Sequence, residues 1–134
     1  MNVLLDTHIL LWAINNDPKL SFPAKEYILD SDNNIYYSTA SIWEITIKHM
    51  NHPDRMNFSG KDLAEYARNA GFLPLFVEDK HVFQLETLKR DENAPVHNDL
   101  IDRLLIAQAK TEKMLFLTSD SLLPYYSEKC IILV

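Results

Sequence analysis

The chain has 134 residues, 47% of them hydrophobic, and a net charge of −6 that comes from 19 acidic and 13 basic residues. Its length predicts one domain over residues 1–134, and its hydrophobic content excludes a disordered chain. Its acidity argues against a protein that only coats nucleic acid. No apolar run reaches the ~20 residues of a membrane span and no signal-peptide pattern is present, which predicts a cytoplasmic protein without a membrane partner. The single cysteine, Cys130, fits a reducing compartment.

The first predicted element is a strand over residues 3–5, since three consecutive apolar residues are typical of a strand buried on both faces of a parallel sheet. The strand ends at Asp6, and a helical pattern over residues 7–14 follows at once. The carboxyl ends of the strands hold the binding crevice in open α/β sheets, so Asp6 is a candidate site residue. The alternative is that Asp6 only caps the helix.

Strand and helix patterns alternate along the rest of the chain. After a helix capped by Ser21, the patterns predict a strand over 35–37, helices over 40–48 and 62–70, a strand over 72–77, a helix over 79–88, a loop over 89–98, a helix over 101–109, and strands over 114–117 and 131–134. Pro74 assigns the strand at 72–77 to a sheet edge or a strand start. The alternation predicts an α/β fold with a mainly parallel sheet of four to five strands.

Glu44 is a second candidate, because a period of 3.6 residues places it on the same helix face as three hydrophobic residues. These are Ala40, Trp43 and Ile47. We therefore expect Glu44 in the core or at its edge, where an unpaired acid is unfavourable. The alternative is a solvent-directed Glu44 that pairs with Lys48 four residues later.

Two further acids lie beside the late strands. Asp102 is in the first turn of the helix at 101–109, where its alternative role is to interact with the helix dipole, because Asp99 is better placed as the N-cap. Asp120 follows the strand at 114–117, and its alternative role is that of a turn residue or a cap of a short helix.

Four carboxylates in one crevice repel one another unless a cation neutralises them, and Mg²⁺ is the natural cation because it takes oxygen ligands. The absence of a His or Cys cluster argues against zinc. His49 and His52 are spaced i, i+3 in a predicted loop without a third ligand, so we expect both to be exposed.

Four segments resemble, in the right order, the motifs of PIN-domain ribonucleases, and specifically of the VapC-like toxins of type II toxin–antitoxin pairs. They are Leu4-Leu5-Asp6-Thr7-His8-Ile9-Leu10-Leu11-Trp12, Ser41-Ile42-Trp43-Glu44-Ile45-Thr46-Ile47-Lys48, Asp102-Arg103-Leu104-Leu105-Ile106-Ala107-Gln108-Ala109 and Leu117-Thr118-Ser119-Asp120. The resemblance implies a single PIN domain with a three-layer α/β/α fold. It also implies an Mg²⁺-dependent endoribonuclease that inhibits translation or growth, in which Mn²⁺ can substitute, with an antitoxin partner, an RNA substrate and a homodimeric state.

The resemblance also implies roles for single residues. In the family, acids at the positions of Asp6, Glu44, Asp102 and Asp120 bind one or two Mg²⁺ or Mn²⁺ ions and hydrolyse RNA, which is metal-assisted phosphodiester hydrolysis. Lys48 and Arg103 lie next to these acids in the sequence, where they hold RNA phosphates or, alternatively, only pair with the acids.

The chain departs from its relatives at His97-Asn98-Asp99-Leu100-Ile101-Asp102, where they carry Arg-Asp-Pro-Phe-Asp after the histidine. Both acids are kept, so the departure bears on RNA contact and on the start of the helix and not on catalysis. One alternative function stays open, and two others lack residues that they require. A catalytically inactive PIN-like module would bind RNA or protein. A haloacid-dehalogenase-like phosphatase would need a second Asp where His8 stands, and a receiver domain would need an adjacent acidic pair near the first strand.

Overall fold

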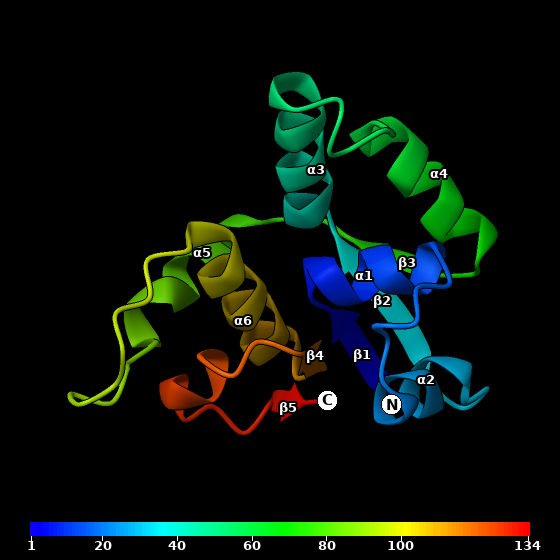
Figure 1. The fold of residues 1–134 in the computed structure, drawn as a ribbon. Coiled ribbons are helices and arrows are strands. Elements are labelled where there is room, and N and C mark those ends of the chain that lie inside the picture. The colour runs from blue at the N-terminus through cyan, green and yellow to red at the C-terminus, as the bar shows by residue number, and fades with distance from the viewer.

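The computed structural model describes residues 1–134 and contains one five-stranded sheet with helices on both faces (Figure 1). In chain order the elements are β1 (Asn2–Leu5), α1 (Thr7–Ile14), α2 (Phe22–Leu29), β2 (Asn34–Ser38), α3 (Thr39–Asn51), α4 (Gly60–Asn69), β3 (Leu73–Leu75), α5 (Asp79–Gln84), the 3₁₀ turn η1 (Leu85–Thr87), α6 (Leu100–Glu112), β4 (Leu115–Thr118), the 3₁₀ turn η2 (Leu123–Tyr126) and β5 (Ile131–Leu133). The strand order is β3-β2-β1-β4-β5, and every pair is parallel. The predicted α/β class with a parallel sheet is confirmed.

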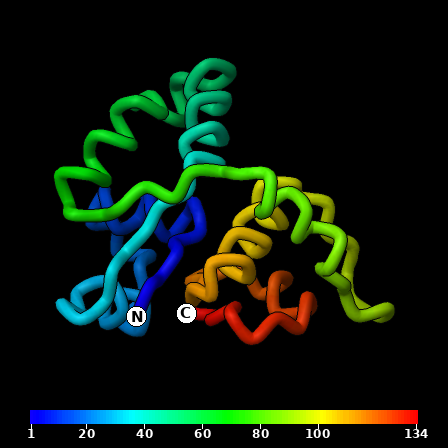
Figure 2. The backbone as a smooth tube through the Cα atoms, turned by 180° about the vertical axis from the view of Figure 1, so that it is seen from behind, coloured from blue at the N-terminus to red at the C-terminus, as the bar shows by residue number.

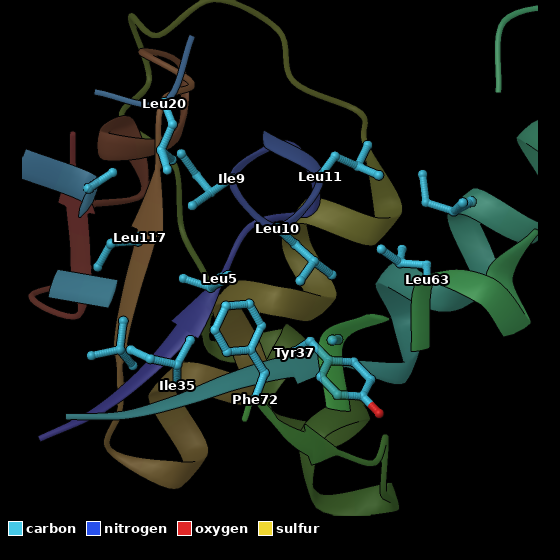
Figure 3. Close-up of a cluster of buried hydrophobic side chains, with 14 residues drawn as sticks. Leu5, Ile9, Leu10, Leu11, Leu20, Ile35, Tyr37, Leu63, Phe72 and Leu117 are labelled. Atoms are coloured by element: carbon cyan, nitrogen blue, oxygen red, sulfur yellow. The ribbon is translucent and has the colours of Figure 1, made fainter. Parts of the chain in front are cut away.

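Strand β1 lies at the centre of the sheet because its residues are apolar toward both faces. Val3 and Leu5 enter the core that α1, α2 and α4 cover, and Leu4 enters the core that α6 covers. Figure 3 shows the first of these cores, in which Leu5 lies with side chains of the neighbouring strands and of α1. The consecutive burial of these side chains is the reason that the strand shows no polar alternation.

The path of the chain creates a switch point beside β1. The chain builds β1, β2 and β3 outward in one direction, and then crosses to the half of the molecule that contains α5 and α6 (Figure 2). It returns through α6 to β4, which pairs with the free side of β1 with Leu5 opposite Leu117. The carboxyl ends of β1 and β4 are therefore neighbours on either side of the point where the strand order reverses, which is where open α/β sheets bind ligands.

The predicted core face of α3 is only partly correct, because Ala40 is buried but Trp43 and Ile47 are exposed. The helix leaves the carboxyl end of β2 and packs against α4 and α6, so its buried residues are Ala40, Ser41 and Ile45. Trp43 is 59% exposed and Ile47 is 42% exposed. Periodicity identifies residues that share a helix face, but it does not say which neighbouring element covers that face.

Sequence signals at helix ends agree well with the structure. Ser21 caps α2 through its side chain, and Asp99 caps α6 in the same way. Gly71 follows the end of α4 with a φ of +87°, a left-handed conformation that glycine adopts without strain. Strand β3 carries Pro74 and is an edge strand, as its proline predicts. None of the helices combines the length and the apolar character that a bilayer span requires.

Candidate metal centre

Asp6 is buried at the carboxyl end of β1, with 4% of its surface exposed. Its Oδ1 accepts the Thr7 N–H at 2.7 Å, and its Oδ2 accepts the hydroxyl of Thr118 at 2.6 Å. Burial raises the pKa of Asp6, while these two hydrogen bonds oppose the rise. The capping role considered for Asp6 is therefore real, but each carboxylate oxygen has a second lone pair, so the cap does not prevent Asp6 from binding a cation.

Asp102 enters the same region from the first turn of α6. Asp99 accepts the Asp102 N–H at 3.0 Å, so Asp99 is the N-cap and Asp102 is the third residue of the helix. The carboxylate that caps α6 is therefore that of Asp99 and not that of Asp102. Its Oδ2 lies 3.2 Å from Nε2 of His97.

The electrostatic environment of Asp102 is strongly unfavourable for a charge. Burial raises its pKa to about 8, and the negative charges of four neighbouring acids add to the rise. In order of decreasing effect these acids are Asp6, Asp99, Glu44 and Asp120. A divalent cation relieves repulsion of this kind, so the donor set fits a metal ion.

Asp120 lies in the turn after β4. Its N–H donates to the hydroxyl oxygen of Thr118 at 3.1 Å, and its Oδ1 accepts the Leu122 N–H at 2.9 Å. The role considered as an alternative, that of a turn residue, is therefore also present. The second oxygen, Oδ2, remains for a ligand or water.

Three residues bring their donor atoms closest together. Ligand atoms of His97, Asp102 and Asp120 all lie within 4.8 Å of one another. Opposite ligands of an octahedral divalent ion are ~4.2 Å apart, twice the usual bond length of ~2.1 Å, so this spacing suits one ion after small adjustments. His97 was assigned no role from the sequence, although it stands in the segment that carries Asp99 and Asp102.

His97 is held by a contact from η2. Its Nδ1 lies 2.7 Å from Oη of Tyr126, and its side chain is 5% exposed. Burial and then the charge of Arg90 lower the pKa of His97, which keeps the imidazole neutral near pH 7. A neutral imidazole is the form that binds metals.

Glu44 lies farther from this cluster. It pairs with Lys48 at 3.0 Å, and its side chain is 17% exposed. The pairing considered as an alternative for Glu44 is therefore present. Its charge still raises the pKa of both Asp6 and Asp102, so its carboxylate belongs to the same acidic region.

Three further residues considered in the sequence have these positions in the structure. Arg103 follows Asp102 on α6 and lines a groove with Trp43. His52 is exposed, as expected. His49 is not fully exposed, because its Nδ1 bonds to the backbone oxygen of Met56 at 2.7 Å and holds the end of α3 to the following loop.

The fold and the motifs agree with comparisons to known proteins. The structure resembles that of VapBC2 from Rickettsia felis bound to a DNA fragment from its promoter, with a TM-score of 0.70, 18% sequence identity, and coverage of 100% of this chain and 98% of that chain. No curated protein matches the sequence. The family model of the PIN domain matches residues 3–129. The chain therefore belongs to the PIN domain family, and the resemblance inferred from its motifs is confirmed.

Proposed function

We propose that residues 1–134 form a single PIN domain that is a divalent-metal-dependent endoribonuclease, the toxin of a type II toxin–antitoxin pair. The observation that carries this proposal is the cluster around Asp102, in which ligand atoms of His97, Asp102 and Asp120 all lie within 4.8 Å of one another. Burial and the charges of the neighbouring acids Asp6, Asp99, Glu44 and Asp120 raise the pKa of Asp102 to about 8, which agrees with a site that a cation neutralises. Repulsion between these carboxylates lowers the stability of the metal-free protein. Destabilising clusters of this kind are common at functional sites. Membership of the PIN domain family and the structural similarity of this chain to VapBC2 support the same function.

In this proposal the acids hold Mg²⁺ or Mn²⁺. Asp102 and Asp120 offer oxygens that lie within 4.8 Å of each other, and Asp6 and Glu44 complete the site directly or through water. The bound ion would lower the pKa of a water molecule and offset charge on the scissile phosphate. Thr118 and Thr7 fix the Asp6 carboxylate by hydrogen bonds, so its orientation is set before any ion binds.

Lys48 and Arg103 are the proposed phosphate contacts. Lys48 is bound to Glu44, but its side chain is 44% exposed, so it can reach RNA from the rim of the site. Arg103 lies on α6 directly after Asp102 and lines the apolar groove that also contains Trp43. Cations at the rim of an acidic site position the RNA backbone and carry no sequence information.

The proposed antitoxin partner is supported by an apolar groove of roughly 210 Å³ between α3 and the helices α5 and α6. Its lining includes Trp43, Val82 and Leu100, which are 59%, 47% and 72% exposed. Contiguous exposed apolar side chains mark interaction surfaces. We propose that the antitoxin covers this groove, and that the chain alone is a homodimer.

The test of the nuclease function is cleavage of a structured RNA by the purified chain with Mg²⁺, with Mn²⁺ and with EDTA. We expect cleavage with either ion and none with EDTA. Asp102→Asn should abolish cleavage, whereas Asp99→Asn should keep it, because Asn also caps helices well. Cleavage that EDTA leaves unchanged would contradict the proposal, and RNA binding without cleavage under every condition would favour an inactive RNA-binding module.

The test of the toxin function uses the protein encoded by the neighbouring reading frame. Expression of the chain should arrest growth, and co-expression of that partner should restore it. Trp43→Ser should weaken co-purification with the partner without loss of RNA cleavage. Light scattering on the chain alone measures whether it is a dimer. Growth that continues during expression of folded, RNA-cleaving chain would contradict the toxin role.

A further inference from the structure

We propose that His97 is a nitrogen ligand of the metal centre, together with Asp102 and Asp120, and that the site therefore binds Mn²⁺ in preference to Mg²⁺. The inference rests on the proposed metal-dependent function and goes beyond it, because the acids alone describe a site of oxygen ligands. It assigns a role to the one residue of the cluster that carries no negative charge.

The positions of the donor atoms support a shared ion. Nε2 of His97 lies 3.2 Å from Oδ2 of Asp102, and neighbouring ligands of an octahedral divalent ion are ~3 Å apart. An oxygen of Asp120 completes a triangle in which every separation is at most 4.8 Å. Three protein ligands leave other positions of the ion for Asp6, for water and for an RNA phosphate.

Tyr126 supplies the partner that a ligating histidine needs. A histidine that binds a metal through Nε2 carries its proton on Nδ1 and donates it to an outer acceptor, which fixes the tautomer and the ring orientation. Oη of Tyr126 lies 2.7 Å from Nδ1 of His97 and can accept this hydrogen bond. The two rings meet edge to face, with centroids 5.5 Å apart and an interplanar angle of 84°, so the orientation of the imidazole is well defined.

Arg90 fastens the segment that carries His97 to the turn that carries Asp120. Its guanidinium donates to the backbone oxygens of Pro95 and Leu122, each at 2.8 Å. It also stacks over the ring of Tyr126 at 4.8 Å from the centroid. Pro95 is two residues before His97, and Leu122 is two residues after Asp120. The segments that carry His97 and Asp120 are therefore held together by contacts that do not involve the ion.

The choice of ion follows from the nitrogen donor. Mg²⁺ strongly prefers oxygen ligands, whereas first-row transition ions also accept imidazole. A site with one imidazole and two carboxylates should discriminate between Mn²⁺ and Mg²⁺ more strongly than a site of carboxylates alone. We expect His97→Gln to weaken Mn²⁺ binding at least about tenfold, because loss of a ligand should cost no less than loss of a ligand's outer hydrogen-bond partner, and to leave Mg²⁺ binding nearly unchanged.

The decisive measurement is electron spin echo envelope modulation of Mn²⁺ bound to the full chain, because a coordinated imidazole gives a ¹⁴N coupling that carboxylates and water do not. We expect this coupling in the wild type, its loss in His97→Gln, and its retention in His8→Gln. His8 is the matched control, because it is another histidine near the acids, as its effect on the pKa of Asp6 indicates, but it is exposed and is not part of the cluster of His97, Asp102 and Asp120. Competition between Mn²⁺ and Mg²⁺, measured by calorimetry on the same proteins, gives the preference.

The outcomes separate this inference from the function on which it rests. Mn²⁺ that binds in an Asp102-dependent manner without ¹⁴N coupling in the wild type would overturn the histidine ligand and leave the nuclease function standing. Coupling that persists in His97→Gln would also overturn it. Failure of the wild type to bind Mn²⁺ at all would overturn both. The wild-type spectrum decides the question even if a variant does not fold.

Discussion

The hydroxyl of Thr118 donates a 2.6 Å hydrogen bond to Oδ2 of Asp6. The same hydroxyl oxygen accepts the N–H of Asp120 at 3.1 Å, so one small side chain at the end of β4 orients acids from two parts of the chain. Both acids lie where β1 and β4 end side by side. The parallel pairing of these two strands is therefore what brings the two carboxylates to the same edge of the sheet.

Thr118→Val should weaken metal binding and destabilise the protein. Valine keeps the shape of threonine but removes the donor to a buried carboxylate, at a cost of about 1–3 kcal/mol in the free energy of unfolding. Calorimetric titration with Mn²⁺ and chemical denaturation measure the two effects. Thr111→Val is the matched control, because its hydroxyl donates to a backbone oxygen within α6 and touches no acid of the site. Equal Mn²⁺ affinity in Thr118→Val and wild type would show that the orientation of Asp6 does not matter for binding.

Much of the fold follows from local rules that a sequence displays. Three apolar residues before Asp6 identify the central strand, and the spacing of Asp99 and Asp102 separates the cap from the acid inside the helix. The contact of His97 with Asp102 could not be predicted in this way. It depends on Tyr126, 29 residues later in the chain, and such contacts are determined by packing and not by periodicity.

The exposed face of α3 could not be predicted for a related reason. The apolar stripe through Trp43 and Ile47 has the pattern of a buried face, yet both side chains are exposed and Trp43 lines an apolar groove. A stripe that binds another protein and a stripe that binds the core have the same sequence pattern, because both bury apolar surface.

The stability of the metal-free protein should fall as the pH rises from about 4 to about 8. The folded protein raises the pKa of Asp102 to about 8 from an ordinary value of 3.8, so the folded state favours the protonated acid. Asp102 therefore contributes its full stabilisation of the folded state below pH 3.8, and this contribution is lost as the pH rises through the folded-state pKa of about 8. Asp102→Asn mimics the neutral acid, so in EDTA its melting temperature should exceed that of the wild type by a margin that grows up to about pH 8.

Asp99→Asn is the control for that comparison, because it also removes a negative charge but keeps a good helix cap. Its melting temperature should follow that of the wild type more closely at every pH. If Asp102→Asn melts below the wild type at pH 8 in EDTA, the carboxylate of Asp102 stabilises the fold and is not strained by its neighbours.

Metal affinity should rise with pH for the same reason. Binding an ion must displace the proton of Asp102, so below about pH 8 the apparent affinity for Mn²⁺ should increase about tenfold per pH unit. Calorimetry in buffers of different ionisation enthalpy should detect the release of about one proton per ion at pH 7. Asp99→Asn should show the same dependence, while Asp102→Asn should bind too weakly to measure. A constant affinity between pH 6 and pH 8 would mean that binding displaces no proton from Asp102 in this range.

Tyr126→Phe should weaken Mn²⁺ binding about 10- to 100-fold without abolishing it, the usual effect of removing the outer partner of a metal-bound histidine. The phenyl ring keeps the packing of Tyr126 and its contact with Arg90, so the lost hydroxyl frees only the orientation of His97. Tyr125→Phe is the matched control, because Tyr125 is 41% exposed and also lies beneath Arg90. The ¹⁴N coupling of bound Mn²⁺ should persist in both variants. If Tyr126→Phe binds Mn²⁺ as tightly as Tyr125→Phe does, the Tyr126 hydroxyl does not position the imidazole, and packing alone holds His97 beside Asp102.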